Sequence, residues 1–131
     1  MNTTLPVVQL DILVVEDHKE TRAALQRLLK RWGHEVRSAS TLQQAYQCLS
    51  EKEFDVILLD IKLPDGEGFE LLERASVGHA YVVVVSGWQT EENMFKASAH
   101  GCREFLLKPG GMERLGACIG EAMRERAAVR T

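Results

Sequence analysis

The chain has 131 residues, with 16 Lys and Arg against 19 Asp and Glu, and a formal net charge of −3. This length predicts one domain with one core, and a composition of 45% hydrophobic and 27% charged residues excludes a disordered chain. The slight acidic excess argues against nucleic-acid binding and against an electrostatic membrane anchor, because neither phosphates nor anionic lipids would be neutralised.

In chain order, the first predicted element is a strand over residues 12–15, a β-branched apolar run without alternation. Such a run is typical of a strand that is buried on both faces. A helix follows, with apolar residues at helical spacing until Gly33 ends it. Residues 35–39 are a weaker strand candidate at a sheet edge. The next helix starts at Thr41, with Gln44 at the capping-box spacing.

The second half of the chain continues the same alternation. Residues 54–59 are a second buried strand, and the turn-rich residues 63–68 predict a loop before a short helix. The strongest strand signal is the apolar run at residues 81–85, which precedes a helix capped by Thr90. A last strand at residues 104–107 leads into a final amphipathic helix.

Strand and helix therefore alternate about five times, which predicts an α/β domain with a parallel sheet and helices on both faces. We predict this domain over residues 11–126, with an N-terminal extension at 1–10 and a C-terminal tail at 127–131. In such sheets, functional residues gather at the carboxyl ends of the strands, near the switch in strand order.

The cysteines and the apolar runs indicate a cytoplasmic location. Cys48, Cys102 and Cys118 are odd in number and far apart, which fits neither a disulfide framework nor a zinc site. The apolar runs are too short to cross a bilayer, and the first ten residues have no secretion-signal pattern. We therefore expect a cytoplasmic protein with no membrane partner.

Chemically active side chains follow four of the predicted strands. Glu16 and Asp17 come after the first, Asp60 after the third, Ser86 ends the fourth and Lys108 follows the fifth. A single acid after a strand is usually only a helix cap. Three acids packed together, however, repel one another unless a cation is present, and hard oxygen ligands suit Mg²⁺. One carboxylate could then attack a phosphoryl group and form an aspartyl phosphate, with Lys108 supplying positive charge.

Four sequence segments, in this order, resemble the receiver domain of bacterial two-component response regulators. They are ILVVED at residues 12–17, DIKLPDGEG at 60–68, VSG at 85–87 and FLLKP at 105–109. The resemblance covers residues 11–126, nearly the whole chain. It implies a flavodoxin-like, doubly wound sheet of five parallel strands in the order 2-1-3-4-5, with five helices.

The resemblance implies a phosphorylation site and a metal site. Asp60 would be the phosphoacceptor. Asp17 would bind Mg²⁺ directly, Glu16 would hold the ion, often through water, and Lys62 would contribute its backbone carbonyl.

The resemblance also implies a switch. The Ser86 hydroxyl would move toward the phosphoryl group, and Phe105 would rotate inward with it. Lys108 would contact the phosphoryl group, and its peptide bond to Pro109 is expected to be cis.

The implied phosphoryl donor is a sensor histidine kinase or a histidine phosphotransfer domain. The face made by the fourth helix, fifth strand and fifth helix would respond by binding a partner or forming a homodimer. The chain would not be an enzyme beyond its own Mg-dependent phosphorylation and dephosphorylation, and this domain would not bind nucleic acid.

Two side chains would flank the phosphoryl group in this fold class. Lys62 stands two residues after Asp60, and Trp88 stands two residues after Ser86. Neither can act as a general base for water at neutral pH. We expect the pair to slow self-dephosphorylation, unless both side chains simply point into solvent.

Several alternatives stay open. The same fold could serve as a phospho-independent binding module, or as a phosphorelay shuttle or phosphate sink without output. An aspartyl-nucleophile phosphatase would need an acid where Lys62 stands, and a hydrolase built on Ser86 would need a Gly-x-Ser-x-Gly turn that Trp88 interrupts. The four histidines lack metal-ligand spacing and are expected at solvent or in loops: His18, His34, His79 and His100.

Overall fold

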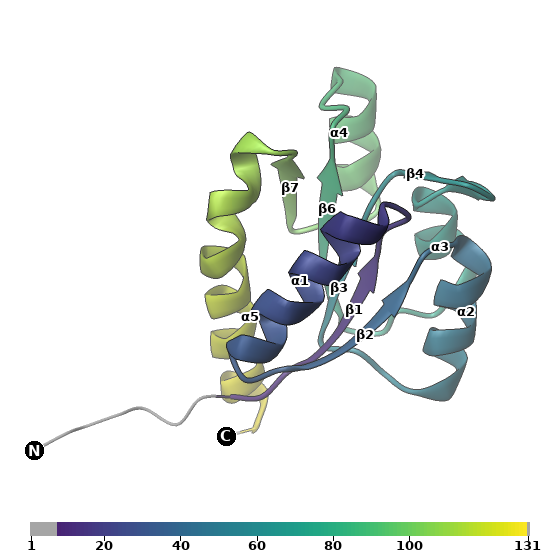
Figure 1. The fold of residues 1–131 in the computed structure, drawn as a ribbon. Helices are drawn as coiled ribbons and strands as arrows, with labels where there is room; N and C mark the ends of the chain where they lie inside the picture. The colour runs from purple at the N-terminus through teal and green to yellow at the C-terminus, as the bar shows by residue number, and fades with distance from the viewer. Residues whose placement is uncertain (1–7, 131) are drawn as a thin grey trace, which may run out of the picture.

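The computed structural model describes residues 8–130, in which strands and helices alternate along the chain (Figure 1). The main sheet comprises β1 (Asp11–Val15), β2 (Glu35–Ala39), β3 (Val56–Leu59), β6 (Tyr81–Ser86) and β7 (Glu104–Leu107). A short antiparallel pair follows β3, made of β4 (Lys62–Leu63) and β5 (Gly66–Glu67). The helices are α1 (Lys19–Arg31), α2 (Leu42–Glu51), α3 (Phe69–Arg74), α4 (Glu91–Ala99), the 3₁₀ helix η1 (Gly110–Arg114) and α5 (Leu115–Arg130).

All neighbouring strands of the main sheet are parallel, in the order β2-β1-β3-β6-β7. This is the predicted order 2-1-3-4-5, so the doubly wound α/β fold is confirmed. The chain builds β2 on one side of β1 and then returns to build β3 on the other side. The switch in strand order therefore lies between the carboxyl ends of β1 and β3, where ligands bind in folds of this kind.

Helices cover both faces of the sheet, as expected. On one face, α1 and α5 share an apolar cluster with strand residues such as Val14 and Leu58 (Figure 1). On the other face, α2 and α3 share a second cluster with Leu13 and Leu59. Successive residues of a strand point to opposite faces. Covering both faces therefore requires continuous apolar strands, which explains why these strands show no alternation.

Capping contacts fix the predicted helix starts. Thr41 Oγ1 accepts the backbone N–H of Gln44 at 3.1 Å, and Thr90 caps α4 in the same way. The Gln44 carboxamide oxygen accepts the N–H of Ser40 at 2.8 Å rather than that of Thr41, so the capping box is displaced by one residue. Gly33, which was predicted to end α1, has a φ of 98°, a conformation that favours glycine.

Some element boundaries differ from the prediction. The strand that was predicted from residue 54 begins at Val56, and the β4–β5 pair, which begins one residue earlier at Lys62, overlaps the predicted loop at 63–68. Leu10, in the predicted N-terminal extension, is fully buried, and residues 1–7 lie outside the described residues. Of the predicted tail, residues 127–130 belong to α5, and Thr131 lies outside the described residues. No helix within residues 8–130 has the length and apolar character that crossing a bilayer requires.

His34 lies in the loop between α1 and β2, as the expectation of solvent or loop positions allows, but it is not exposed. It is buried, and its Nδ1 accepts the backbone N–H of Leu10 at 3.0 Å. Burial lowers the pKa of His34, which favours the neutral ring with Nδ1 as the acceptor. This residue therefore fixes the path of the chain into β1.

Candidate functional site

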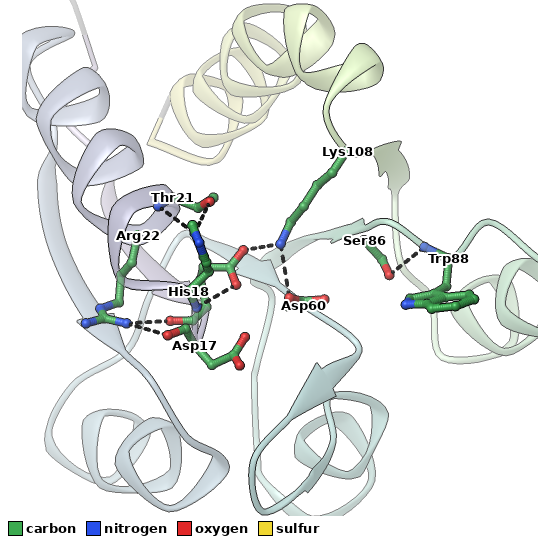
Figure 2. Close-up of polar contacts among 9 residues, drawn as sticks. Asp17, His18, Thr21, Arg22, Asp60, Ser86, Trp88 and Lys108 are labelled. Atoms are coloured by element: carbon green, nitrogen blue, oxygen red, sulfur yellow. Dashed lines mark hydrogen bonds and ion pairs between the residues drawn. The ribbon is translucent and has the colours of Figure 1, made fainter.

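The carboxyl ends of four parallel strands bring five of the predicted site residues together (Figure 2). Glu16 and Asp17 follow β1, Asp60 follows β3, Ser86 is the last residue of β6, and Lys108 follows β7. Glu16, Asp60 and Ser86 are buried, and Asp17 is exposed. The parallel sheet thus gathers residues that are up to 92 positions apart in the sequence.

The Lys108 ammonium connects the two buried carboxylates. Its Nζ donates to Asp60 Oδ2 at 3.0 Å and to Glu16 Oε1 (Figure 2). Burial acts to lower the pKa of Lys108, but the hydrogen bonds and charges of the two carboxylates outweigh it and raise the pKa above its ordinary value. The side chain therefore stays positive at neutral pH. The peptide bond from Lys108 to Pro109 is cis, as expected.

Glu16 is held from both its backbone and its side chain. Its N–H donates to Ala39 O at 2.9 Å, and its Oε2 accepts the N–H of His18 at 3.1 Å. Burial raises the pKa of Glu16, and the charge of Asp60 acts in the same direction, while the bonds from Lys108 and His18 oppose both. An ionised carboxylate at this position therefore needs positive charge beside it.

Arg22 clamps the loop that carries the two adjacent acids, and the sequence analysis missed it. Its Nη1 donates to the backbone carbonyl of Glu16 at 3.0 Å and to that of Asp17 at 3.2 Å (Figure 2). His18 is the N-cap of α1, with Nδ1 accepting the N–H of Thr21 at 3.3 Å. An arginine in the first turns of a helix carries no motif that could have shown this contact in advance.

The acidic side chains fit a divalent cation. Glu16, Asp17 and Asp60 each offer a carboxylate oxygen, and these oxygens lie within 4.8 Å of one another. Among the described residues, Lys108 is the one cation bonded to their side chains, so three carboxylates face one positive charge. Hard oxygen donors with excess negative charge are the ligands that Mg²⁺ prefers. Lys62, the predicted source of a backbone carbonyl ligand, begins β4 two residues after Asp60.

Ser86 and Phe105 lie on the same face of the sheet. Ser86 is paired in register with Leu107, and Phe105 with Val84, so their side chains share one face. Ser86 is fully buried, and its Oγ accepts the backbone N–H of Trp88 at 3.1 Å. Phe105 is half-buried against the apolar cluster beneath α3 and α4. The two predicted switch residues therefore lie on neighbouring strands with a common packing layer.

Lys62 and Trp88, the two predicted flanking residues, contact each other. The Lys62 ammonium lies 3.9 Å from the centroid of the Trp88 ring, within cation–π distance. Trp88 is 55% exposed. The pair joins the loop after Asp60 to the loop after Ser86, and both side chains are also exposed to solvent.

Gly68 closes the loop that follows Asp60. Its N–H donates to Ile61 O at 2.6 Å, and a Cβ at this position would lie 2.1 Å from the backbone oxygen of Asp60. A contact that short cannot be made, so the tight return of the chain requires glycine here. The bond between Gly68 and Ile61 therefore holds the two ends of the loop together, and these ends lie beside the acidic residues.

A cavity of ≈ 440 Å³ lies elsewhere in the molecule. It is lined by residues such as Asp55, Tyr81 and Arg103, at the amino ends of β3, β6 and β7. Arg103 is paired with Glu125 at 2.6 Å. Because the acids and Lys108 lie at the opposite ends of these strands, the cavity does not belong to the candidate site.

Comparisons with known proteins match the family that the sequence motifs resemble. The response regulator receiver domain family matches residues 12–119. The transcriptional regulatory protein ZraR of Klebsiella oxytoca is 31% identical over 117 residues, which cover 88% of this chain and 26% of that protein. The sensory/regulatory protein RpfC of Xanthomonas campestris pv. campestris is 34% identical over 104 residues, which cover 75% of this chain and 14% of that protein.

The chain thus spans about a quarter or less of the length of these two relatives. A similar solved structure is that of a response regulator receiver domain protein (CheY-like) from Methanospirillum hungatei. It has 29% sequence identity and a TM-score of 0.83, and the match covers 92% of this chain and 98% of that chain. The likeness therefore extends over the complete five-stranded fold.

Proposed function

The chain belongs to the response regulator receiver domain family, and we propose that it accepts a phosphoryl group on Asp60. The donor would be a phosphohistidine of a sensor histidine kinase or of a histidine phosphotransfer domain. The observation that carries the proposal is the position of the Asp60 carboxylate. It is bonded to Lys108 at 3.0 Å and shares the acidic cluster with Glu16 and Asp17.

The proposed reaction is a phosphoryl transfer between two side chains. An Asp60 carboxylate oxygen forms a bond to phosphorus while the phosphorus–nitrogen bond of the donor breaks, and the imidazole nitrogen keeps the electron pair. Lys108 lies where positive charge would offset the equatorial oxygens. The Ser86 Oγ accepts the backbone N–H of Trp88. Its own proton therefore stays available for donation to a phosphoryl oxygen.

Glu16, Asp17, Asp60 and the backbone carbonyl of Lys62 would hold Mg²⁺. The bound ion would supply positive charge against the carboxylates and the phosphoryl oxygens. Two cationic side chains of the chain itself orient these acids. Arg22 bonds to the backbone carbonyls of Glu16 and Asp17. Lys108 bonds to the carboxylates of Glu16 and Asp60.

The geometry favours this function over a phospho-independent binding module on the same fold. A module of that kind would not need a half-buried lysine bonded to two carboxylates, or a buried hydroxyl on the neighbouring strand. A phosphorelay shuttle or a phosphate sink would use the same groups, and would differ from a regulator in its partner rather than in this site. On this proposal the domain catalyses only its own phosphorylation and dephosphorylation.

Incubation with acetyl phosphate tests the proposal directly. We expect intact-mass spectrometry to show one added phosphoryl group in the presence of Mg²⁺. Removal of divalent cations with EDTA is expected to abolish the labelling, because three carboxylates would then face one ammonium. Labelling that is equally fast with EDTA would contradict the metal assignment. No labelling with either acetyl phosphate or a phosphorylated histidine phosphotransfer domain would contradict the function.

The face made by α4, β7 and α5 is the proposed output surface. Its large exposed apolar side chains support this, since Phe95 is 75% exposed and Met94 is 44% exposed on α4, with Leu107 at the edge of β7. On phosphorylation this face would bind a partner or a second copy of the chain in a homodimer.

We expect the phosphoryl analogue beryllofluoride to shift the amide resonances of Ser86 and Phe105, because the two residues share one face of adjacent strands. An amide NMR titration with and without the analogue measures this. The amide of Ser50, at the far end of α2, is an internal reference that should not move. Unchanged shifts for both Ser86 and Phe105 would contradict the proposed switch.

A further inference from the structure

We infer that Asp65 is a positioning residue for the loop that carries the phosphoacceptor, an inference that rests on the proposed function. Asp65 lies at the turn between β4 and β5, five residues after Asp60. It does not belong to the acidic cluster. Its carboxylate instead reaches another element, where Oδ1 accepts the backbone N–H of Leu42 at 2.8 Å and Oδ2 accepts that of Gln43 at 3.0 Å.

These two bonds complete the N-terminus of α2. The first backbone N–H groups of a helix have no partner within the helix. Thr41 accepts the N–H of Gln44, and Asp65 accepts those of the two residues between them. The negative carboxylate is also favourable at the positive end of the helix dipole. The bonds from α2 lower the pKa of Asp65, so the carboxylate is charged at neutral pH.

The hairpin between Asp60 and Gly68 is too short to fix its own position. Its two strands have two residues each, paired as Lys62 with Glu67 and Leu63 with Gly66. An isolated pair of this length has little stability of its own. Its base is closed by the bond from Gly68 N to Ile61 O at 2.6 Å, and its tip is fixed to α2 by Asp65. The hairpin also has Leu63 packed against the apolar cluster of α2 and α3 and an exposed ion pair of Glu67 with Lys96 at 3.7 Å, so loss of the contact at the tip would loosen the hairpin without detaching it.

The base of the hairpin lies at the candidate site. Lys62, which begins the hairpin two residues after Asp60, places its ammonium 3.9 Å from the centroid of the Trp88 ring. The backbone N–H of Trp88 donates to the Ser86 hydroxyl at 3.1 Å. Asp65 thus acts through the hairpin on the position of Lys62, and the Trp88 indole reports that position without any phosphorylation.

The chain offers a matched pair of variants. Asp65→Ala removes two acceptors from the N-terminus of α2 and releases the hairpin. Thr41→Ala removes an acceptor from the same N-terminus but leaves the Asp65 contact in place. Both changes should lower the thermal midpoint, because both leave helix N–H groups without their capping partner. Only the first should affect the site. Asp65→Asn keeps one carbonyl acceptor and should restore part of the wild-type behaviour.

Two measurements on the full chain decide the matter. For Asp65→Ala we expect the rate of phosphorylation by acetyl phosphate with Mg²⁺ to fall about tenfold, since a displacement well below 1 Å at a reacting group has effects of this order. Thr41→Ala should stay close to wild type. Without any phosphodonor, the Trp88 indole N–H resonance, assigned with Trp88→Phe, should shift in Asp65→Ala and not in Thr41→Ala.

Equal phosphorylation rates for Asp65→Ala and Thr41→Ala would overturn the inference. A protein that is not phosphorylated in any form would instead contradict the proposed function. The indole resonance would then decide the positioning role by itself: a shift confined to Asp65→Ala would support it, and no shift would overturn it.

Discussion

Asp60→Asn is expected to abolish phosphorylation by acetyl phosphate, with no added phosphoryl group detectable by intact-mass spectrometry. The substitution keeps the size of the side chain and removes the anionic oxygen that would bond to phosphorus. Asp60 is buried, with 11% of its side chain exposed, and its Oδ2 bonds to Lys108. The amide oxygen of asparagine can still accept that bond, so we expect the variant to fold.

Two controls separate loss of the nucleophile from general damage to the site. Circular dichroism and thermal unfolding should show a folded Asp60→Asn protein. Asp65→Asn introduces the same chemical change at a carboxylate outside the acidic cluster, and it should still be labelled, although more slowly than wild type. If Asp60→Asn is labelled as well as wild type, the nucleophile is another group, and Glu16 and Asp17 would be the next residues to test.

The second large effect concerns the lifetime of the phosphoryl group. Replacing both Lys62 and Trp88 by alanine is expected to speed the loss of phosphate from Asp60 by about tenfold, which corresponds to roughly 1.4 kcal/mol of barrier. Hydrolysis requires a water molecule in line behind phosphorus. The Lys62 ammonium lies 3.9 Å from the centroid of the Trp88 ring, and on the proposed function this pair would cover that position. An indole has no acceptor for a proton of water, and on the proposed function the pair would act by keeping water from that position.

The decay is followed by phosphate release after the donor is removed from phosphorylated protein. Phe95→Ala is the matched control, because it removes an exposed aromatic side chain from α4, a helix that carries none of the predicted site residues. This control should leave the decay unchanged. Decay in the double variant that is as slow as in wild type, or slower, would show that the two side chains do not guard the site.

The sequence predicts the sheet and the residues at its edge for a simple physical reason. Each buried strand is a continuous apolar run, and each run ends at a polar residue that cannot be buried without a partner. Asp60 is such a residue, Lys108 follows the half-buried edge strand β7, and in a parallel sheet the ends of neighbouring strands meet at one edge. Pattern and topology together therefore place the acids beside the lysine.

The contacts that orient these residues could not be predicted in this way. Arg22 binds the backbone carbonyls of Glu16 and Asp17, and Asp65 binds the backbone N–H groups of a helix that begins 23 residues earlier. Every residue has backbone groups, so a side chain that bonds to them does not require a particular residue type at the other position. The sequence therefore contains no pair of residue types that would predict such a bond. Such contacts require the fold to be known first.

His34 and the β4–β5 pair show two further limits. A lone histidine has no periodicity to mark it as buried, and the partner of its hydrogen bond, Leu10, is 24 residues away in the sequence. The residues of the pair are rich in turn formers, which predict a loop. Gly66 nevertheless adopts a φ of 148°, and a Cβ at that position would lie 2.8 Å from a side-chain carbon of Leu42. Position 66 therefore requires glycine because of its close approach to α2, a contact that local sequence does not show.

Reductive trapping of the phosphorylated residue in the wild-type protein tests the central claim most directly. Borohydride reduces an acyl phosphate to an alcohol, so the modified side chain can be located by peptide mass spectrometry after digestion. Following incubation with acetyl phosphate and Mg²⁺, the account predicts an alcohol at position 60 and at no other acidic residue. An alcohol at Glu16 or Asp17, with Asp60 unmodified, would contradict the account.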